Sequence, residues 1–211
     1  MDVIESRNRM LGETLVKNLE RRHFEAYYCP TSEDAIARVK QLMPAGSSVT
    51  WGGSETIRRM GLTEALHESD YKVLDRDKVE TREEQLEIYR QAFSCDYYLS
   101  SANAISEDGV IVNIDGNGNR VAAISWGPTH VIFVIGLNKV TKDVESALAR
   151  ARGTASPTNA QRFDIDTPCR KDGVCHNCKS EDCICTCIHF LRHSRPARRH
   201  IVVLVGEDLG Y

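Results

Sequence analysis

Apolar residues recur along this chain at two spacings, and each spacing predicts a different kind of element. Leu11, Leu15 and Leu19 repeat at every fourth position among charged residues, which predicts an amphipathic helix over residues 2–22. Short apolar runs bounded by turn residues predict strands, at 24–29, 47–50, 71–74, 96–100 and 201–205. Capping residues and helical spacing predict further helices, at 31–44, 57–68, 83–93 and 141–152. Strands and helices that alternate in this order are typical of a parallel sheet covered by helices on both faces.

The middle of the chain departs from this alternation. Three short apolar runs, each preceded by a polar turn, lie at 110–114, 121–125 and 131–135. The first two are separated by five residues rich in Gly and Asn, which predicts a β-hairpin added antiparallel to the sheet. The third run is apolar throughout, as expected for a strand buried on both faces. Farther on, the composition of residues 154–159 predicts a loop.

Polar side chains and glycines gather where these predicted strands end. The strand at 47–50 passes through two glycines into a helix start, where glycines let a backbone approach a ligand and free N–H groups favour an anion. Open α/β sheets bind ligands outside the carboxyl ends of their strands. We therefore predict a site for a small polar or anionic molecule, formed by Gly52, Gly53, Ser54, Thr56, Asn103, Asp115, Asn119, Arg120, Asn138 and Lys139. The alternative interpretation is that these residues only form turns and helix caps.

The composition limits the kind of protein that this chain can be. Its 211 residues suit a single domain, 1–211, with one sizeable core. A net charge of -3 with mixed signs, and no basic stripe with interleaved aromatic residues, argues against binding to nucleic acid or to a membrane surface. Because the amino terminus is charged throughout, we expect neither a signal peptide nor a membrane span, and we expect a cytoplasmic protein.

Six of the eight cysteines lie between residues 169 and 187. Thiols stay reduced in the cytoplasm, so such a cluster indicates a metal site or a redox device more than a disulfide framework. Cys175 and Cys178 form a C-x2-C pair that can chelate one metal, and Cys169 and Cys183 could complete four sulfur ligands. These ligands suit either zinc or an iron–sulfur cluster, and their spacing does not decide between the two.

Other residues of this region allow different interpretations. Cys183, Cys185 and Cys187 alternate with other residues, so a strand would place them on one face and leave the last two as packing residues or spare thiols. His176 and His189 are further candidate ligands. The alternative to a metal site is a compact loop of reduced cysteines, cross-linked on oxidation.

Several short motifs together resemble the LUD (lactate utilisation) domain family, and closest to them is a branch with a carboxyl-terminal cysteine motif. The motifs are WGGSET at 51–56, ANAISEDG at 102–109, NIDGNGNRVAA at 113–123, GLNK at 136–139, TPC followed by GVCHNC within 167–178, and VGEDLG at 205–210. The resemblance covers nearly the whole chain. It implies a NagB/RpiA/CoA-transferase-like fold, a three-layer α/β/α sandwich with a mostly parallel sheet and a Cys-rich loop at 167–188.

The same resemblance implies a function. Bacterial members of the family belong to operons for L-lactate oxidation, beside iron–sulfur partner proteins, and our first hypothesis gives this chain such a role. It would bind a small carboxylate or phosphate-bearing ligand, with Arg120 and Lys139 neutralising the anion and with amides of Gly53 and Ser54 as donors.

Two further hypotheses remain open. CoA transferases of the related fold use a glutamate nucleophile near a glycine turn, and Glu107 and Asp108 precede Gly109 in this way. They are the catalytic candidates of an independent enzyme acting on a sugar phosphate or a CoA thioester. The third hypothesis is a metal- or redox-responsive module with the cysteine loop as its sensor. The sequence does not decide whether the chain is an enzyme or forms a homo-oligomer.

Overall fold

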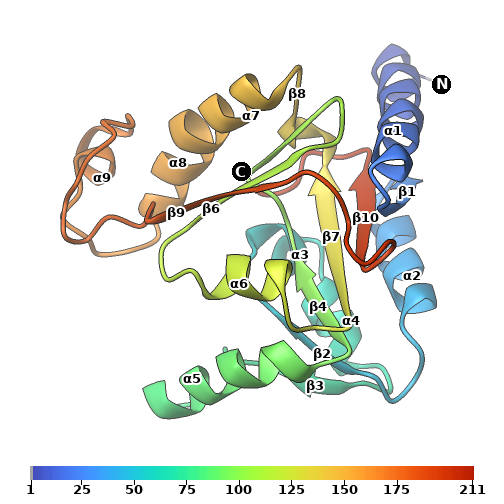
Figure 1. The fold of residues 1–211 in the computed structure, drawn as a ribbon, viewed down its shortest axis with the longest axis horizontal. Coiled ribbons are helices and arrows are strands. Elements are labelled where there is room, and N and C mark those ends of the chain that lie inside the picture. Colours follow the sequence, from blue (N-terminus) through green and yellow to red (C-terminus); the bar gives the residue numbers. More distant parts are fainter. Residues whose placement is uncertain (1) are drawn as a thin grey trace.

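One six-stranded sheet, in which all neighbouring strands run parallel, forms the centre of the molecule (Figure 1). The computed structural model describes residues 2–211. In spatial order the strands are β1 (Glu25–Cys29), β10 (His200–Val205), β7 (His130–Gly136), β4 (Tyr97–Ser100), β2 (Ser48–Trp51) and β3 (Lys72–Leu74). The predicted parallel sheet is confirmed, and the last strand of the chain inserts between β1 and β7. Because all six strands run the same way, their carboxyl ends share one edge.

A second, four-stranded sheet lies beside the first. Its order is β8 (Val140–Thr141), β5 (Ala104–Ser106), β6 (Ile111–Asp115) and β9 (Cys187–Leu191). The β5–β6 and β6–β9 pairs are antiparallel, whereas β5 and β8 are parallel. The antiparallel strands therefore form a sheet of their own and do not extend the parallel one.

Helices and the second sheet cover the two faces of the main sheet. The helices are α1 (Val3–Arg21), α2 (Ser32–Leu42), α3 (Glu55–Arg59), α4 (Leu62–His67), α5 (Arg82–Gln91), α6 (Asn119–Ser125), α7 (Val144–Arg150), α8 (Ser156–Ala160) and α9 (Pro168–Asp172). Within residues 2–211, no helix has the length and apolar character needed to cross a membrane.

The side chains of β7 divide between the two cores. Ile132 and Val134 pack with α2, α3 and α4, whereas Phe133 and Ile135 pack with α1, α6 and the second sheet. Both faces of β7 are therefore buried, as its unbroken apolar run predicts. The predicted three-layer α/β/α arrangement is confirmed, with the second sheet contributing to one outer layer.

The predicted hairpin over 110–125 is wrong in its second half, because residues 119–125 form α6. Gly118 has a φ of 77° and ends the turn after β6. The carboxylate of Asp115 then accepts hydrogen bonds from the backbone N–H groups of Arg120 (3.1 Å) and Val121 (3.3 Å). These two contacts satisfy N–H groups that the first turn of a helix leaves free, so the chain continues as a helix.

Three other predicted elements need correction. Residues 154–159 are helical, since a π-helical turn at Ala151–Ala155 leads into α8, whose early Pro157 needs no backbone N–H. The predicted helix at 57–68 is two helices, divided at Gly61, whose φ is 80°. Cys183 and Cys185 precede β9, which begins at Cys187, so no strand aligns the three cysteines on one face.

Candidate functional site

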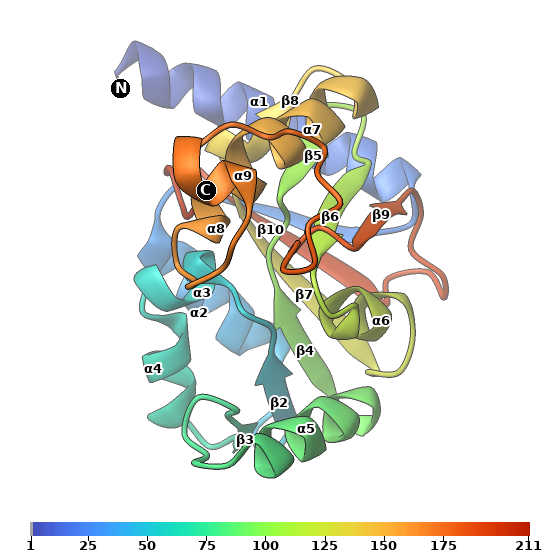
Figure 2. The ribbon, with the colours of Figure 1, turned by 90° about the vertical axis from the view of Figure 1, so that its left-hand side faces the viewer.

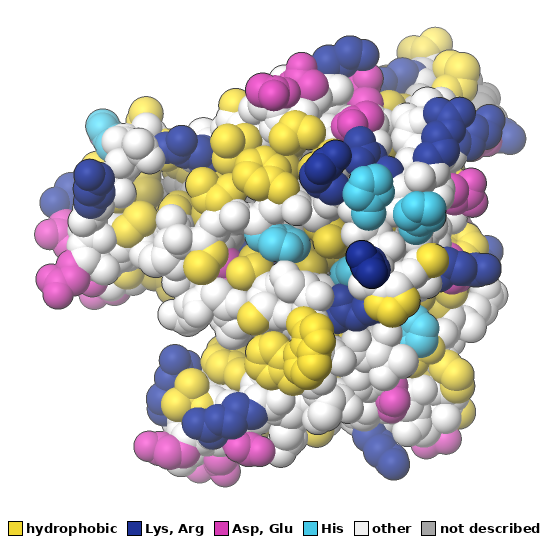
Figure 3. Space-filling view, viewed as in Figure 1, with side chains coloured by type: hydrophobic (Ala, Val, Ile, Leu, Met, Phe, Trp, Pro, Cys, Tyr) yellow, Lys and Arg dark blue, Asp and Glu magenta, His cyan; other side chains and the backbone are white. Residues whose placement is uncertain are grey.

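A cavity of about 700 Å³ opens at the carboxyl edge of the main sheet. Its walls come from the segments that follow β2, β3, β4 and β7, from α5, from the β6–α6 turn, from α8 with the chain after it, and from Tyr211. Figure 2 looks toward this side of the molecule, and Figure 3 shows the surface hollowed between the arm that carries α9 and the lobe that carries α5. The cavity therefore lies where the parallel topology predicts a ligand site.

Most residues of the predicted ligand site line this one cavity. They are Gly53, Ser54, Thr56, Asn103, Asp115, Asn119, Arg120 and Lys139. Gly52 does not line the cavity. It packs against Tyr98, since a Cβ atom on Gly52 would lie 2.8 Å from the hydroxyl oxygen of this tyrosine. Asn138 holds the carboxyl-terminal tail instead, because its Oδ1 atom accepts a hydrogen bond from the backbone N–H of Leu209 (3.2 Å).

Lys139 is the most deeply buried charged group of the cavity, with 3% of its surface exposed. Its Nζ atom donates to Thr56 Oγ1 (2.8 Å), Ser101 Oγ (3.2 Å) and the carbonyl of Ala102 (3.1 Å). None of the ion pairs within residues 2–211 includes it. Burial, together with the positive charges of two arginines, lowers the pKa of Lys139 to about 7. The site thus contains an ammonium group surrounded by neutral oxygen atoms and cations.

Arg120 is fixed beside this lysine by acceptors on the second sheet. Its guanidinium donates to the carbonyl of Ile114 (2.6 Å), to Asn113 Oδ1 (3.2 Å) and to Asn103 Oδ1 (3.3 Å). Its Nε atom lies 3.7 Å from a carboxylate oxygen of Asp115, and 13% of the side chain is exposed. The guanidinium is therefore held in place before any ligand arrives, which lowers the entropic cost of binding one.

Arg76 belongs to the cavity, although sequence reasoning missed it. It follows β3, and a Cβ atom on Gly53 would lie 2.7 Å from its Nη2 atom. Its Nη1 atom donates to the hydroxyl of Tyr89 (2.6 Å), whose ring lies 5.4 Å from the guanidinium carbon. A signal was present in the sequence, because Arg76 lies two residues after the predicted strand at 71–74, and the carboxyl end of a parallel strand lies at the ligand edge of the sheet.

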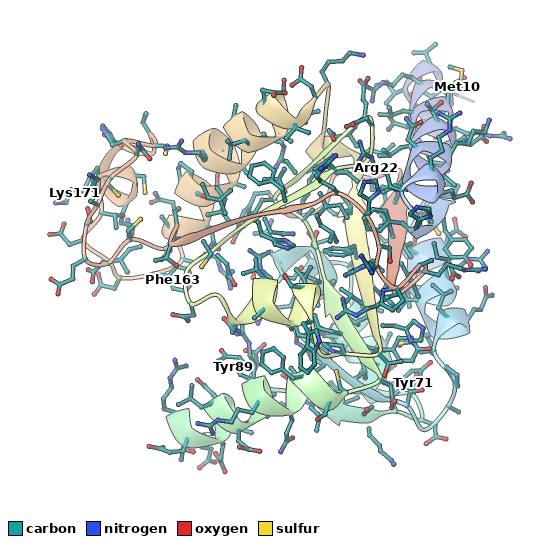
Figure 4. The ribbon with its side chains drawn as sticks, viewed as in Figure 1. Met10, Arg22, Tyr71, Tyr89, Phe163 and Lys171 are labelled. Atoms are coloured by element: carbon teal, nitrogen blue, oxygen red, sulfur yellow. The ribbon has the colours of Figure 1, made fainter. Side chains whose placement is uncertain are left out.

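The charges at the rim of the cavity neutralise one another. Glu55 pairs with Arg162 (2.9 Å) and with Arg58 (3.3 Å), and Arg58 also pairs with Asp77. Figure 4 labels Tyr89 on α5 and Phe163 beyond α8, two aromatic residues of the cavity wall. Among the residues that the structure describes, Lys139 is the one cation of the cavity wall without an ion pair, and it lies at the buried, inner end of the cavity.

A second, smaller cavity of about 70 Å³ adjoins the first. Its lining includes five thiols, which belong to Cys169, Cys175, Cys178, Cys183 and Cys185. All cysteines are free, and within residues 2–211 no three His, Cys, Asp or Glu side chains already converge in a metal-binding arrangement. Burial raises the pKa of the Cys185 thiol to about 11, whereas hydrogen bonds from Ser180 lower the pKa of Cys178.

The two candidate histidines lie in different places. His176 lines the small cavity, and its Nε2 atom lies 2.6 Å from a carboxylate oxygen of Asp172. His189 lies in β9, where its Nε2 atom is 3.1 Å from Ser125 Oγ. Only the first therefore lies beside the predicted cysteine ligands.

Comparison with known families decides what kind of domain this is. The family model of the LUD domain matches residues 12–205. The chain belongs to the LUD domain family. Comparison with the curated proteins gives no match. Among solved structures, this LUD domain is similar to a DUF162 family protein from Deinococcus radiodurans, with a TM-score of 0.52 and 14% identity over 95% of this chain and 97% of the other.

Two solved structures match a shorter part of this LUD domain. The translation initiation factor eIF-2B of Pyrococcus horikoshii OT3 gives a TM-score of 0.38 and 16% identity over 54% of this chain and 49% of the other. Ribose 5 phosphate isomerase A of Neisseria gonorrhoeae gives a TM-score of 0.35 and 14% identity over 52% of each chain.

The motifs that carried the family resemblance do not all meet at the cavity of the LUD domain. In the ANAISEDG motif, Asn103 reaches the cavity, but Glu107 and Asp108 occupy the β5–β6 turn and do not line it. Glu107 pairs with Lys142 (2.8 Å), and Asp108 pairs with Arg22, which Figure 4 labels at the end of α1.

The carboxyl-terminal motif closes the inner end of the LUD cavity. Gly210 has a φ of 63°, and a Cβ atom on it would lie 2.6 Å from Thr56 Oγ1 and 3.3 Å from Lys139 Nζ. Only a residue without a side chain fits this approach without strain. The tail therefore packs directly against the two groups that define the inner end.

Proposed function

We propose that this LUD-domain protein binds a small anion, with a carboxylate or a phosphate, in the large cavity. In this proposal it serves L-lactate utilisation in the cytoplasm together with iron–sulfur partner proteins. The observation that carries the ligand class is Lys139, a buried ammonium that pairs with no carboxylate of residues 2–211. The family, named for lactate utilisation, supports the pathway.

An anion at the inner end would offset the electrostatic cost of burying Lys139 beside other cations. A buried charge is costly unless an opposite charge compensates it, and the charges that act on Lys139 are the cations Arg120 and Arg150. The three hydrogens of its ammonium already have acceptors, so its effect on a ligand is mainly electrostatic. Ser101 accepts one of these hydrogens, and its hydroxyl keeps its own hydrogen to donate to the anion.

The volume of the cavity bears on the size of the ligand. Pockets for small molecules commonly have about 300–1,000 Å³, so a cavity of about 700 Å³ suits a metabolite larger than a three-carbon acid. L-Lactate would fill only its inner part, beside Lys139 and Arg120. The outer part, lined by Arg76 and Tyr89, offers a second cation and an aromatic face to an extension of the ligand.

Calorimetric titration tests the ligand class. We would titrate L-lactate, pyruvate and inorganic phosphate into the wild type and into Lys139→Met and Arg120→Met variants at a pH just below 7. The control is Lys142→Met, which removes the same charge from a side chain that is 79% exposed and pairs with Glu107. We expect at least one probe to bind, with affinity lowered about tenfold or more by either cavity substitution, because each removes a positive charge from a largely buried site and a loss of about 1.4 kcal/mol is tenfold in affinity. The control should bind as the wild type does.

Two results would contradict this proposal. One is that none of the three anions binds, and the other is that Lys139→Met and Arg120→Met bind them as tightly as the control does. The pathway is tested separately, by growth on L-lactate of a source strain in which the Lys139→Met gene replaces its own. Normal growth with normal protein abundance would remove the role in lactate utilisation but leave the ligand class standing.

An independent enzyme that uses Glu107 as a nucleophile has no comparable observation in its favour. Its carboxylate pairs with Lys142 in the β5–β6 turn, and it does not line the large cavity. We therefore base the proposed function on the cationic inner end.

A further inference from the structure

We propose that Cys169, Cys175, Cys178 and Cys183 bind a thiophilic metal centre, either one zinc ion or an iron–sulfur cluster, beside the wall between the two cavities. This inference rests on the cysteine loop and is independent of the proposed ligand and pathway.

The four thiols line one small cavity, although they come from different parts of the chain. The four thiols come from three separate stretches, namely α9, the turn at 173–178 and the run that precedes β9, and all line the same cavity of about 70 Å³. They are partly accessible, unlike the buried Cys29 and Cys95, which pack in the two cores of the main sheet. Thiols that serve only as small apolar side chains are normally buried in this second way.

The cysteine loop has little regular structure to hold its shape. Residues 173–186 contain no helix or strand, and the side chain of Val174 is 58% exposed. Loops of this length without regular structure are uncommon in compact domains unless they are functional or disordered. The loop therefore lacks an apolar core of its own, and a bound metal would supply the missing cross-link, as it does in small metal-binding domains.

A cation lies beside the four thiols. Four thiolates around a divalent metal leave a net negative charge, which a neighbouring cation would offset. Arg152 lines the same cavity and donates a hydrogen bond to Asn177, between the two cysteines of the C-x2-C pair. His176 pairs with Asp172 instead, so we do not count it among the ligands.

Metal binding would require the thiols to lose their protons and turn inward, since within residues 2–211 no three ligand groups already converge. Cys185 is the competitor for the fourth position, because it also lines the small cavity. It packs against the apolar cluster of Ile114 and Ala147, however, and Cys183 does not. Cys183 is therefore the side chain with more freedom to turn toward a metal.

The position of Cys183 would place the metal close to a ligand in the large cavity. Ile114, Ser156, Cys183 and Ile184 line both cavities, so they form a shared wall. A centre bound to Cys183 would therefore lie next to whatever the large cavity holds.

Metal analysis of protein purified without oxygen tests this inference. Zinc, iron and acid-labile sulfide would be measured per chain, with a visible spectrum, before and after incubation with Zn²⁺ or with Fe²⁺ and sulfide. The samples are the wild type, Cys175→Ser/Cys178→Ser, Cys169→Ser, Cys183→Ser and Cys185→Ser, with Cys187→Ser as the control because Cys187 does not line the small cavity.

We expect stoichiometric zinc, or iron with sulfide, in the wild type and in the control. The double variant, Cys169→Ser and Cys183→Ser should each keep less than about a tenth of it, because losing a thiolate ligand removes much of the binding free energy. A wild type that holds no metal even after reconstitution would overturn the proposal. Loss in Cys185→Ser with retention in Cys183→Ser would overturn the assignment of the fourth ligand.

A variant that fails to fold would also lose metal, so a second measurement uses the wild type alone. Adding a chelator should lower the midpoint of its thermal unfolding, and restoring the metal should raise it again. An unchanged midpoint together with absent metal would again contradict the proposal. Neither measurement depends on anion binding, so a failure here is distinguishable from a failure of the proposed function.

Discussion

The two cavities share a wall, yet they are built in different ways. The large cavity is bounded by the ends of buried parallel strands, and its cations are held by hydrogen bonds within the protein, as with Arg120 on Asn113 and the Ile114 carbonyl. The small cavity is bounded largely by a segment without regular structure, and its thiols are free. The first should therefore keep its shape when empty, because the core that forms it folds without a ligand. The second should depend on a cross-link.

The largest effect that separates the two should appear in limited proteolysis. If the cysteine loop is held by metal, a chelator should raise the rate of cleavage within residues 161–186 by more than about tenfold, because cleavage follows the population of opened chain. Mass spectrometry of the fragments would locate the cuts. The α1 to β4 region should stay resistant, and cleavage there at the same rate would mean that the two regions do not differ in this way.

The pH dependence of anion binding should sharpen the description of the large cavity. Lys139 has a pKa of about 7, well below the ordinary lysine value, and a bound anion would raise it. Near pH 6, well below this pKa, the ammonium is present with or without ligand, so affinity should be flat. Above pH 7 binding requires uptake of a proton, and affinity should fall by up to about tenfold per pH unit until the pKa of the complex is reached.

This dependence can be measured by titrating L-lactate or pyruvate, whose carboxylates stay ionised, between pH 6 and pH 9. Lys139→Met should bind more weakly and show no such slope. A wild-type affinity that is constant from pH 7 to pH 9 would show that Lys139 does not act through its charge.

The smallest effect should come from the tail that covers the inner end. Gly210→Ala places a Cβ atom against Thr56 and Lys139, so we expect anion affinity to fall by about fivefold, the equivalent of about 1 kcal/mol. Gly46→Ala is the matched control, because Gly46 also has a positive φ, of 78°, but no atom within 4 Å of its Cβ position. Both variants carry the same backbone strain, so only the contact differs. Equal affinities in the two variants would mean that the tail does not shape the site.

The sequence alone determined the parallel sheet, because an unbroken apolar run such as that of β7 can be buried only between two layers. It also predicted that Lys139 lies at the carboxyl edge, because this residue follows β7, a strand of the parallel sheet. Arg120 reaches the same cavity from the start of α6, after β6, a strand of the second sheet. The sequence could not determine α6, because the run from Val121 to Ser125 fits a strand as well as a helix. The capping contacts of the Asp115 carboxylate decided between them.

Tertiary structure also decided which polar residues meet. Arg76 enters the site because β3 pairs with β2, which brings the end of one strand beside Gly53 at the end of the other. Glu107 is kept out because β5 pairs with β6 and β8 in a separate sheet, whose turn points elsewhere. The same folding places Cys183 in the wall of both cavities. Local pattern fixes what each segment tends to form, whereas the distances between groups far apart in the chain depend on which strands pair, and that is a property of the whole fold.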